Sequence, residues 1–369
     1  MTGEHNNMVT ILKRSKGRKK AIWRSRIHFP GRFSDTCFSN TMARHLALAP
    51  LLLACLIFTV STNQATASQD TVIQDTAKQI KAVSLLQEDL LGAVRAYTAK
   101  HDDTLLDLAR NNGLGFVEIV AANQGIDPWI PGAGTAITLP TGHLLPDAPR
   151  EGVVINLAEH RLYHFTSEGI TTYAIGVGRE GWNTPLGVTK IVRKKKNPIW
   201  YPPQSIRDEK PDLPKVVRAG PNNPLGQHAL YFDWPTYLVH GTNMPWGVGR
   251  RVSHGCIRLY PESIERLFSE VDVGTRVEVI DQPIKIGRFE GELYLEVYPE
   301  PDQADELERD GHFESAAKRS NSDAYYKIRS DAGDNLSRLN WPAIRSTLAE
   351  RTGVPVRITL AKRAETSAE

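Results

Sequence analysis

Hydrophobic and polar positions divide the chain into regions of different periodicity. Apolar residues recur at helical spacing over residues 68–96, which predicts a helical linker. Residues 97–140 mix strand and helix patterns, whereas residues 151–282 consist mainly of short apolar runs separated by turn residues. Residues 299–369 are rich in charge and carry no motif, so their role stays unassigned. The pattern therefore predicts several structural regions in one chain.

Residues 97–140 predict a strand, two helices and a closing strand. Asp103 and Thr104 can cap the first helix, which Asn112 and Gly113 would end. A second helix fits Phe116 to Asn123. The outer strands are expected at 97–100 and 136–140, so the region predicts a small βααβ module.

The region from 151 to 282 is predicted to be mainly β, a mostly antiparallel sandwich or barrel with few helices. One helix is expected at 261–271, where Pro261 suits the first helical turn. A further helix at 341–351 and a strand at 354–360 are expected in the charged tail. The expected strands of the β region are 153–157, 161–165, 171–177, 188–192, 229–233, 237–240 and 276–280.

Residues 1–67 read as an N-terminal extension followed by an export signal. Leu46 to Val60 is an apolar run shorter than the roughly 20 residues that span a bilayer, and Arg44 precedes it. Small residues at 65–67 then suit a cleavage site. We expect a protein exported to the periplasm; an uncleaved inner-membrane anchor is the alternative. Cys55 only faintly resembles a lipoprotein processing site.

Charge is unevenly distributed along the chain. The formal net charge is +3, but the first 45 residues hold ten Lys and Arg against two acidic residues, so the remainder carries −5. The overall basic balance is therefore no evidence for nucleic-acid binding, and no nucleic-acid partner is expected.

Signal cleavage would leave a single thiol. The chain has three cysteines, and cleavage after Ala67 would remove Cys37 and Cys55. Cys256 would then have no partner for an internal disulfide. In an oxidising exported compartment, such a thiol is either buried for structural reasons or used in chemistry.

A catalytic cysteine needs a nearby base, because the thiolate is its reactive form. Two histidines are close in sequence: His240, at the end of a predicted strand, and His254, two residues before Cys256. A strand end would hold His240 rigidly, as a general base requires. The Gly241 carbonyl can orient the other imidazole nitrogen, the part that a carboxylate plays in serine proteases.

The residues beside the thiol add two further functions. Gly255 permits a tight turn, so the amides of Gly255 and Cys256 could converge on an oxyanion, and each such donor is worth roughly 3 to 4 kcal/mol. Arg258 offers a fork that suits a substrate carboxylate. A zinc site made by His240, His254 and Cys256 is an alternative, but no fourth ligand is evident. No cofactor is otherwise indicated.

The full motif resembles the L,D-transpeptidase family with its YkuD-like catalytic domain. The core of the resemblance is His240-Gly241-Thr242-Asn243 followed by the run from Ser253 to Leu259. It covers roughly residues 151–282. Supporting segments lie at 184–187, 197–200, 220–226 and 273–275.

Carried over residue by residue, the resemblance implies a complete catalytic set. Cys256 would be the nucleophile, His240 the general base and Gly241 its backbone orienter. Further positions would form the pocket: His254 and Ser253 as residues that order the site, Arg258 as a substrate contact, and Asn243 and Trp246 as weaker candidates for the pocket wall.

The family acts on peptidoglycan stem peptides, which implies a thioester on Cys256 and release of the terminal D-alanine. An amine would then resolve the thioester, either a second diaminopimelate or the terminal Lys of an outer-membrane lipoprotein. Hydrolysis, as in an L,D-carboxypeptidase or other amidohydrolase of the same fold, is the nearest alternative. A catalytically dead protein that only binds the wall is another.

Residues 97–140 resemble the LysM family, whose members bind glycans that contain N-acetylglucosamine. The sequence departs from that pattern at Asp102, where a Gly is usual. The order of this module and the segment 151–156 resembles the ErfK/YbiS-like subgroup, which favours a lipoprotein acceptor. Matching positions are Tyr97, Asp103, Thr104, Leu105, Asn123, Pro131, Gly132, Leu139 and Pro140.

Overall fold

The structure is a computed structural model that describes residues 88–361. The export signal expected within residues 1–67 and the linker residues 68–87 lie outside this range. Within it, no helix is long and apolar enough to cross a membrane.

The predicted order of strand, helix, helix and strand is present in the N-terminal module. Thr104 caps the first helix, because its side chain accepts a hydrogen bond from the Asp107 amide across 3.0 Å. The glycan-binding role of the module stays a prediction. The four elements are β2 (Arg95–Thr98), α2 (Leu105–Asn111), α3 (Phe116–Ala121) and β3 (Ala136–Leu139).

The helical prediction for residues 68–96 is wrong at its C-terminal end. Strand β1 (Leu90–Gly92) pairs with β4 (Gly142–Leu144), and β2 already begins at Arg95. Leu90 and Leu91 continue the helical periodicity of the preceding residues, but pairing with β4 gives their backbone groups partners in a sheet. Tertiary pairing thus overrides the local helical pattern.

An eight-stranded sheet forms the centre of the region predicted to be β, in the order β13-β11-β10-β9-β14-β5-β6-β7. Most neighbours are antiparallel; β11 with β13 and β14 with β5 are parallel. The strands are β5 (Gly152–Asn156), β6 (Arg161–Thr166), β7 (Gly169–Ala174), β9 (Gly187–Lys196), β10 (His228–Phe232), β11 (Leu238–His240), β13 (Ile257–Arg258) and β14 (Arg276–Ile280).

The two ends of this sheet meet, which agrees with the prediction of a mainly β sandwich or barrel. Gly176, just after β7, and Arg258 of β13 exchange two backbone hydrogen bonds of 2.8 and 2.9 Å. Nearby, β8 (Val177–Gly178) pairs with β12 (Arg251–Ser253). A side chain at position 176 would meet the Gly247 carbonyl, so the closure requires glycine there.

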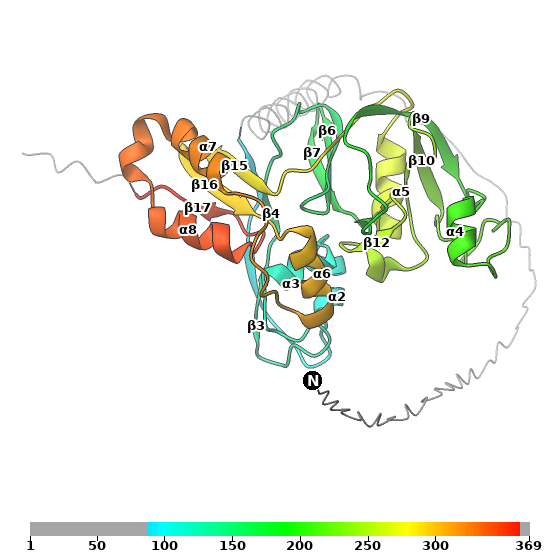
Figure 1. Cartoon of the computed structure of the whole chain (residues 1–369), viewed down its shortest axis with the longest axis horizontal. Helices are drawn as coiled ribbons and strands as arrows, with labels where there is room; N and C mark the ends of the chain where they lie inside the picture. Colours follow the sequence, from blue (N-terminus) through cyan, green and yellow to red (C-terminus); the bar gives the residue numbers. More distant parts are fainter. Residues whose placement is uncertain (1–87, 362–369) are drawn as a thin grey trace, which may run out of the picture. The chain divides into compact units, whose positions relative to one another are not determined.

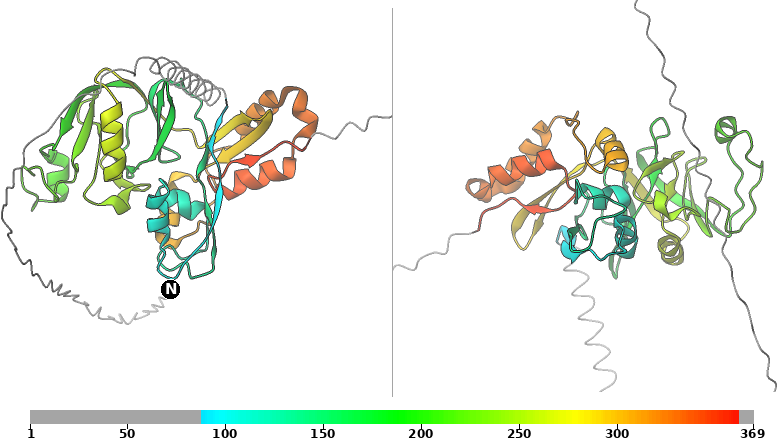
Figure 2. Two further views of the ribbon diagram at one scale, coloured as in Figure 1. Left: turned by 180° about the vertical axis from the view of Figure 1, so that it is seen from behind. Right: turned by 90° about the horizontal axis from the view of Figure 1, so that it is seen from below.

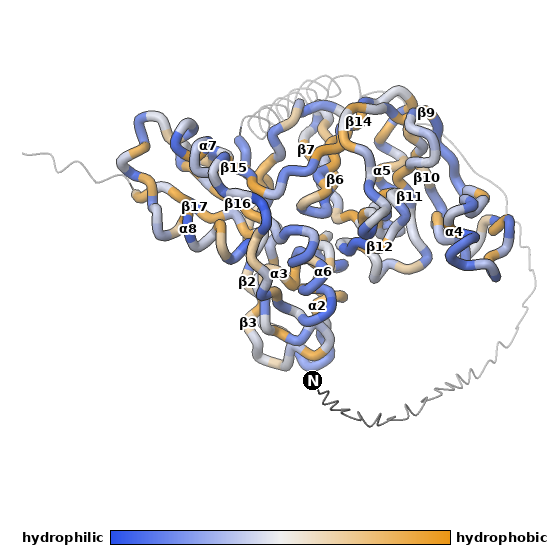
Figure 3. The backbone as a smooth tube through the Cα atoms, viewed as in Figure 1, coloured by the Kyte–Doolittle hydropathy of each residue, from blue (hydrophilic) through white to orange (hydrophobic). Residues whose placement is uncertain are grey.

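Helix α5 (Pro261–Glu270) covers one face of the sheet (Figure 1). Its Ile264 and Leu267 pack against Val239 and Ile257 in the main hydrophobic cluster. These strand positions alternate with His240 and Arg258, which point to the opposite face. Figure 3 shows hydrophobic residues along strands of this sheet, such as β7 and β14. The sheet thus buries one face under α5 and presents the catalytic candidates on the other.

The C-terminal region begins earlier than predicted and is an ordered α/β unit. Hairpin strands β15 and β16 were not predicted, and α7 and α8 lie beside them (Figure 2). The predicted helix at 341–351 is confirmed, whereas the strand expected at 354–360 shortens to β17. The elements are β15 (Ile284–Phe289), β16 (Glu292–Val297), α6 (Pro301–Asp310), α7 (Ser322–Ala332), η2 (Gly333–Arg338), α8 (Trp341–Glu350) and β17 (Val356–Arg357).

Helix α6 attaches the C-terminal region to the N-terminal module. Its Ala304 and Leu307 join the hydrophobic cluster formed by α2, α3 and β3, and Gly311 ends the helix in a left-handed conformation. The module core is therefore completed by residues more than 150 positions away in sequence.

A buried ionic cluster joins the N-terminal module, the β region and the C-terminal region. Lys285 of β15 lies 2.5 Å from Glu159 and 3.1 Å from Glu296, while Arg161 of β6 lies 2.6 Å from Glu118 of α3. All five side chains are at most 2% exposed. Burial raises the pKa of both Glu118 and Glu296. Because a buried charge without a partner is costly, each region depends on the others for neutralisation.

Candidate active site

Cys256 lies in a tight turn between β12 and β13. The adjoining Gly255 has φ +94, a backbone conformation that residues with a side chain rarely adopt. A Cβ atom there would come within 2.9 Å of the Tyr237 ring. Strand β13 runs parallel to β11 with His240 opposite Arg258. The turn therefore delivers the thiol to the end of the strand pair that carries His240.

Two hydroxyl groups brace this turn. Ser253 Oγ donates to the Cys256 carbonyl oxygen across 2.6 Å and accepts the Gly255 amide across 3.1 Å. From the other side, Thr184 Oγ1 donates to the Gly255 carbonyl oxygen across 2.9 Å. The backbone around the thiol is thus held by side chains from both of its flanks.

The imidazole of His240 is oriented by the next residue in the chain. Its Nδ1 donates to the Gly241 carbonyl oxygen across 2.6 Å, the contact expected from the sequence. This bond makes Nε2 the unprotonated nitrogen of the neutral ring. Burial, with a smaller contribution from the Arg258 cation, lowers the pKa of His240 to about 3. The ring is therefore neutral at pH 7, with Nε2 as its accepting nitrogen.

The thiol of Cys256 is also neutral in the resting site. Burial raises its pKa to about 11, against the opposing effects of a hydrogen bond from the Leu238 amide and the charge of Arg258. Its Sγ donates to the Thr236 carbonyl oxygen across 3.5 Å. Thr236 itself adopts φ +73, which is uncommon for a residue other than glycine. The resting proton is thus directed at a backbone carbonyl.

A cavity of about 470 Å³ gathers the catalytic candidates. Among the residues that line it within 88–361 there are two arginines and two histidines but no carboxylate. Such a lining favours an anionic ligand. The polar and charged residues of the wall that come from the sheet, the loop before β11 and the turn are Arg193, Tyr231, Thr236, Tyr237, His240, Ser253, His254, Cys256 and Arg258.

Arg258 is a largely buried cation in this cavity. Its Nε is buried and has no hydrogen-bond partner within the described part of the chain. Burial lowers the pKa of its guanidinium, and the nearby Cys256 opposes this effect. A buried donor without a partner is costly, so the position suits a ligand that supplies an acceptor.

The oxyanion hole predicted from the two amides needs a correction. The Gly255 amide is already bonded to Ser253 Oγ, because the left-handed turn directs it back along the chain. Gly255 therefore shapes the turn and does not donate to an oxyanion. Of the predicted pair, the Cys256 amide is the one that takes no part in the contacts of Ser253 and Thr184.

His254 belongs to a polar cluster at the mouth of the cavity. Its Nε2 lies 3.0 Å from Glu209 Oε2 and 3.0 Å from Arg179 Nη2, and Glu209 belongs to α4 (Gln204–Glu209). The ring of Trp182 packs edge-on against it at 4.7 Å. The hydrogen bond from His254 lowers the pKa of Glu209. His254 thus connects the turn to the loop that carries α4.

Asn243 and Trp246, expected as weaker pocket candidates, do not line this cavity. Asn243 is exposed. Trp246 lies in η1 (Pro245–Gly247), is 65% exposed, and borders a separate small cavity beside α2. The chain turns away from the sheet after Thr242, so proximity in sequence does not bring these side chains back to Cys256.

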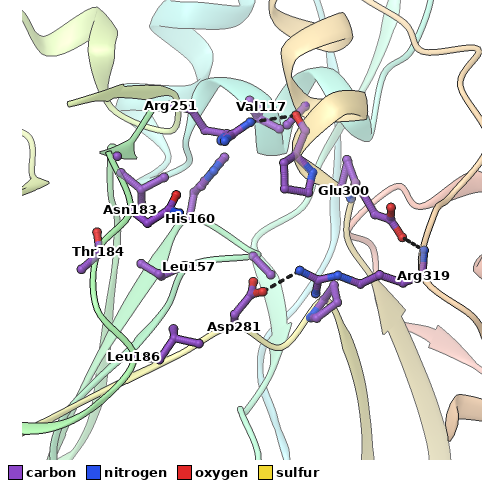
Figure 4. A pocket seen from close by; sticks show the side chains of 17 residues that line it. Val117, Leu157, His160, Asn183, Thr184, Leu186, Arg251, Asp281, Glu300 and Arg319 are labelled. Carbon is purple, nitrogen blue, oxygen red and sulfur yellow. Dashed lines mark hydrogen bonds and ion pairs between the residues drawn. The ribbon is translucent and has the colours of Figure 1, made fainter. Parts of the chain in front are cut away.

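A second cavity, of about 370 Å³, borders the loop that follows Trp182 (Figure 4). Asn183, Thr184 and His160 line it, and an ion pair between Arg319 and Asp281 borders it. It contains neither Cys256 nor His240. Thr184 contacts both this cavity and the Gly255 carbonyl, so the loop separates the two spaces.

Within residues 88–361, no group of three or more His, Cys, Asp or Glu side chains is arranged to hold a metal ion. His254 is instead engaged by Glu209 and Arg179, and His240 by Gly241. The zinc alternative for His240, His254 and Cys256 therefore has no support in this geometry.

Several residues of the site were not singled out from the sequence. Thr236, Trp182 and Glu209 come from three separate segments, and Arg193 and Tyr231 from β9 and β10. Tyr231 lies in a predicted strand, whereas Arg193 lies just after the strand expected at 188–192, which extends to Lys196 in the structure. Thr236 and Trp182 are loop residues and Glu209 ends the short helix α4, so their positions depend on the fold.

Comparison with known proteins agrees with the motif. Residues 150–279 match the YkuD family, described as the L,D-transpeptidase catalytic domain. The chain is 43% identical over 208 residues to a protein named probable L,D-transpeptidase YcfS from Escherichia coli K12, covering 53% of this chain and 65% of the relative. The probable L,D-transpeptidase YbiS of the same strain is 43% identical over 193 residues, covering 50% and 63%.

A shorter relative is matched along almost its whole length. The putative L,D-transpeptidase YkuD from Bacillus licheniformis is 30% identical over 185 residues, which is 50% of this chain and 97% of that protein. The chain spans only 63–65% of the length of the two Escherichia coli relatives. The family match over residues 150–279 includes both Cys256 and His240. The chain therefore belongs to the L,D-transpeptidase family with the YkuD catalytic domain.

Proposed function

We propose that the protein is an L,D-transpeptidase that acts on peptidoglycan stem peptides through a thioester on Cys256. The observation that carries this proposal is the cavity that unites Cys256, His240 and Arg258, with His240 Nδ1 occupied by the Gly241 carbonyl. This arrangement leaves Nε2 as the basic nitrogen. The family to which the chain belongs supports the same reaction.

In the first step, His240 Nε2 takes the thiol proton as Sγ attacks the carbonyl of the third stem residue. The C–S bond forms, the C–N bond to the terminal D-alanine breaks, and the imidazolium gives its proton to the departing amine. The cation of Arg258 faces a carboxylate of the donor. Free D-alanine and an acyl-enzyme result.

In the second step, an amine attacks the thioester. His240 accepts the proton that this amine loses, and the proton then returns to the thiolate that leaves. The product is an amide, and Cys256 and His240 are restored to their neutral forms. No net oxidation or reduction takes place, so the cycle needs no redox partner.

We infer that the acceptor is the terminal Lys of an outer-membrane lipoprotein, with a second diaminopimelate as the competing acceptor. The identity to YbiS and YcfS, over about half of this chain, supports the subgroup on which this inference rests. The βααβ order of residues 95–139 supports a LysM-like module that binds peptidoglycan glycan. We therefore also propose that the protein works in the periplasm, where such substrates would meet it.

Intact-protein mass spectrometry of the full chain tests the acylation step. Incubation with a stem tetrapeptide should add the mass of the tripeptide acyl group to wild type. Cys256→Ala should show no adduct, and His240→Gln should form it at least 100-fold more slowly. An unmodified wild-type protein at all times would contradict the proposal.

Product analysis distinguishes the acceptors. The acylated protein is mixed with a Lys-terminated lipoprotein peptide, a diaminopimelate-containing stem peptide, or both. An amide to Lys is the expected main product. If only free tripeptide forms while both amines are present, the protein is an L,D-carboxypeptidase rather than a transferase.

A further inference from the structure

A row of residues crosses the sheet in line with the proposed nucleophile. Arg193 of β9 lies opposite Tyr231 of β10, and Tyr231 lies opposite Leu238 of β11. Because Val239 lies opposite Ile257 in the parallel pair, Leu238 corresponds to Cys256, and the Leu238 amide bonds to Sγ. Residues directly opposite one another share a face of a sheet. Arg193 and Cys256 therefore face the same cavity.

The alternation along β9 confirms which face Arg193 occupies. Lys194 Nζ lies 4.8 Å from the centre of the Phe268 ring of α5 and donates to the Val271 carbonyl. Its neighbour Arg193 consequently projects from the opposite face and lines the cavity of Cys256. Lys196 lies in the same alternation as Lys194, on the α5 side.

The guanidinium of Arg193 is held in place but is not neutralised. Its central carbon lies 3.7 Å from the centre of the Tyr231 ring, which fixes the plane of the group. No carboxylate pairs with it in the described part of the chain, and none lines the cavity. Stacking covers the face of a guanidinium and leaves its N–H edge available for a bidentate carboxylate.

We propose that Arg193, stacked on Tyr231, is a specificity-determining subsite that binds a free carboxylate of the peptide substrate at a distance from Cys256. This inference rests on the proposed function for the identity of the peptide. Arg258 takes the anionic group close to the thiol, and Arg193 takes a second one at the far end of the row. The enzyme then selects stem peptides with free side carboxylates over their carboxamides.

The span of the row fits a peptide ligand. Three steps between neighbouring strands separate β9 from β13, which corresponds to roughly 14 Å. An extended peptide advances about 3.4 Å per residue. That span is therefore covered by about four residues, or by fewer when a long side chain of the ligand meets the Arg193 side chain.

The test compares a stem tetrapeptide whose side carboxylates are free with versions in which one of them at a time is converted to a carboxamide, which separates the carboxylate bound by Arg193 from the one that faces Arg258. Wild type should prefer the free form by about tenfold in kcat/KM, because a charged hydrogen bond is lost in the amide. In Arg193→Gln the preference should fall close to one through a higher KM with kcat little changed, since a remote contact binds substrate and transition state alike. Arg193→Lys should retain part of the preference.

Lys196→Gln is the matched control, because it removes the same charge from the same strand on the α5 side. It should keep the wild-type preference. The subsite is refuted if Arg193→Gln leaves the preference intact, or if Lys196→Gln abolishes it equally, which would indicate a general effect of charge.

A binding experiment separates this inference from the proposed reaction. In a Cys256→Ala background, calorimetry should show weaker binding of the carboxamide peptide, and Arg193→Gln should abolish that difference. This result would hold even if wild type were never acylated, in which case the reaction fails and the subsite stands. Equal affinity for both peptides would overturn the subsite, whatever the acylation result.

Discussion

Ser253 and Cys256 are joined across the catalytic turn by a hydrogen bond of 2.6 Å, in which the Ser253 hydroxyl donates to the Cys256 carbonyl oxygen. The same hydroxyl accepts the Gly255 amide, so one small side chain satisfies two backbone groups of a strained turn. The position of the nucleophile therefore depends on a residue that takes no part in the bond changes.

Ser253→Ala should slow acylation of Cys256 by at least tenfold, because the turn loses two hydrogen bonds worth about 1 kcal/mol each. Ser253→Thr keeps a hydroxyl at the same position and should react at nearly the wild-type rate. The measurement is the time course of acyl-enzyme formation with a stem tetrapeptide or a carbapenem. Equal rates for the Ala and Thr variants would show that the brace has no kinetic role.

The resting thiol should be weakly reactive at neutral pH. With a pKa of about 11 for Cys256 and about 3 for His240, both groups are neutral between these values. Alkylation of Cys256 by iodoacetamide should therefore rise with pH from 7 to 10 without a plateau, since only the thiolate reacts. A rate that is already constant from pH 6 to 8 would instead indicate a preformed thiolate–imidazolium pair.

Acid should destabilise the fold through His160, a buried residue beside the second cavity (Figure 4). Burial lowers its pKa from 6.5 to about 4, so between these values the unfolded state binds more protons. The free energy of unfolding consequently falls as the pH drops through this window, by up to about 3 kcal/mol.

His160→Asn is the variant that tests this dependence. Asparagine tolerates the left-handed backbone of this position, where φ is +53. The variant should show a flatter dependence of unfolding free energy on pH between 4 and 6.5, measured by denaturant titration. An unchanged slope would assign the acid sensitivity to other groups.

Lys285→Met should destabilise the protein by about 3 to 5 kcal/mol, because it leaves Glu159 and Glu296 buried without their cation. Thermal unfolding of the full chain measures the effect. Lys318→Met, which removes an exposed lysine paired with Asp302, should change Tm little. Similar Tm losses in the two variants would contradict the importance of burial.

The catalytic core could be predicted because its parts are adjacent in sequence. His240 and Gly241 are neighbours, and the turn at Cys256 is encoded by Gly255. The contact between His254 and Glu209 joins positions 45 residues apart through a loop, so no local pattern indicates it. Trp246, a weaker pocket candidate implied by the family resemblance, borders another cavity, because the chain turns away from the sheet after Thr242.

The hairpin at 284–297 shows a different limit of sequence reasoning. Lys285 and Glu296 occupy strand positions but are completely buried, whereas hydrophobic alternation predicts such residues to face solvent. Their burial depends on their mutual ion pair and on Glu159, which lies more than 120 residues earlier. Hydrophobic periodicity cannot identify a strand whose inward face carries paired charges.

The ionic cluster also shows that the segment shared with the family is shorter than the part of the chain that folds together. A fragment trimmed to residues 150–279, the segment shared with the family, would retain Glu159 and Arg161 but lose Lys285 and Glu118. Two unlike charges, each deprived of its counter-ion, would then be left in what had been interior. The catalytic domain of this protein therefore relies on residues outside the family segment to neutralise charges in its own interior.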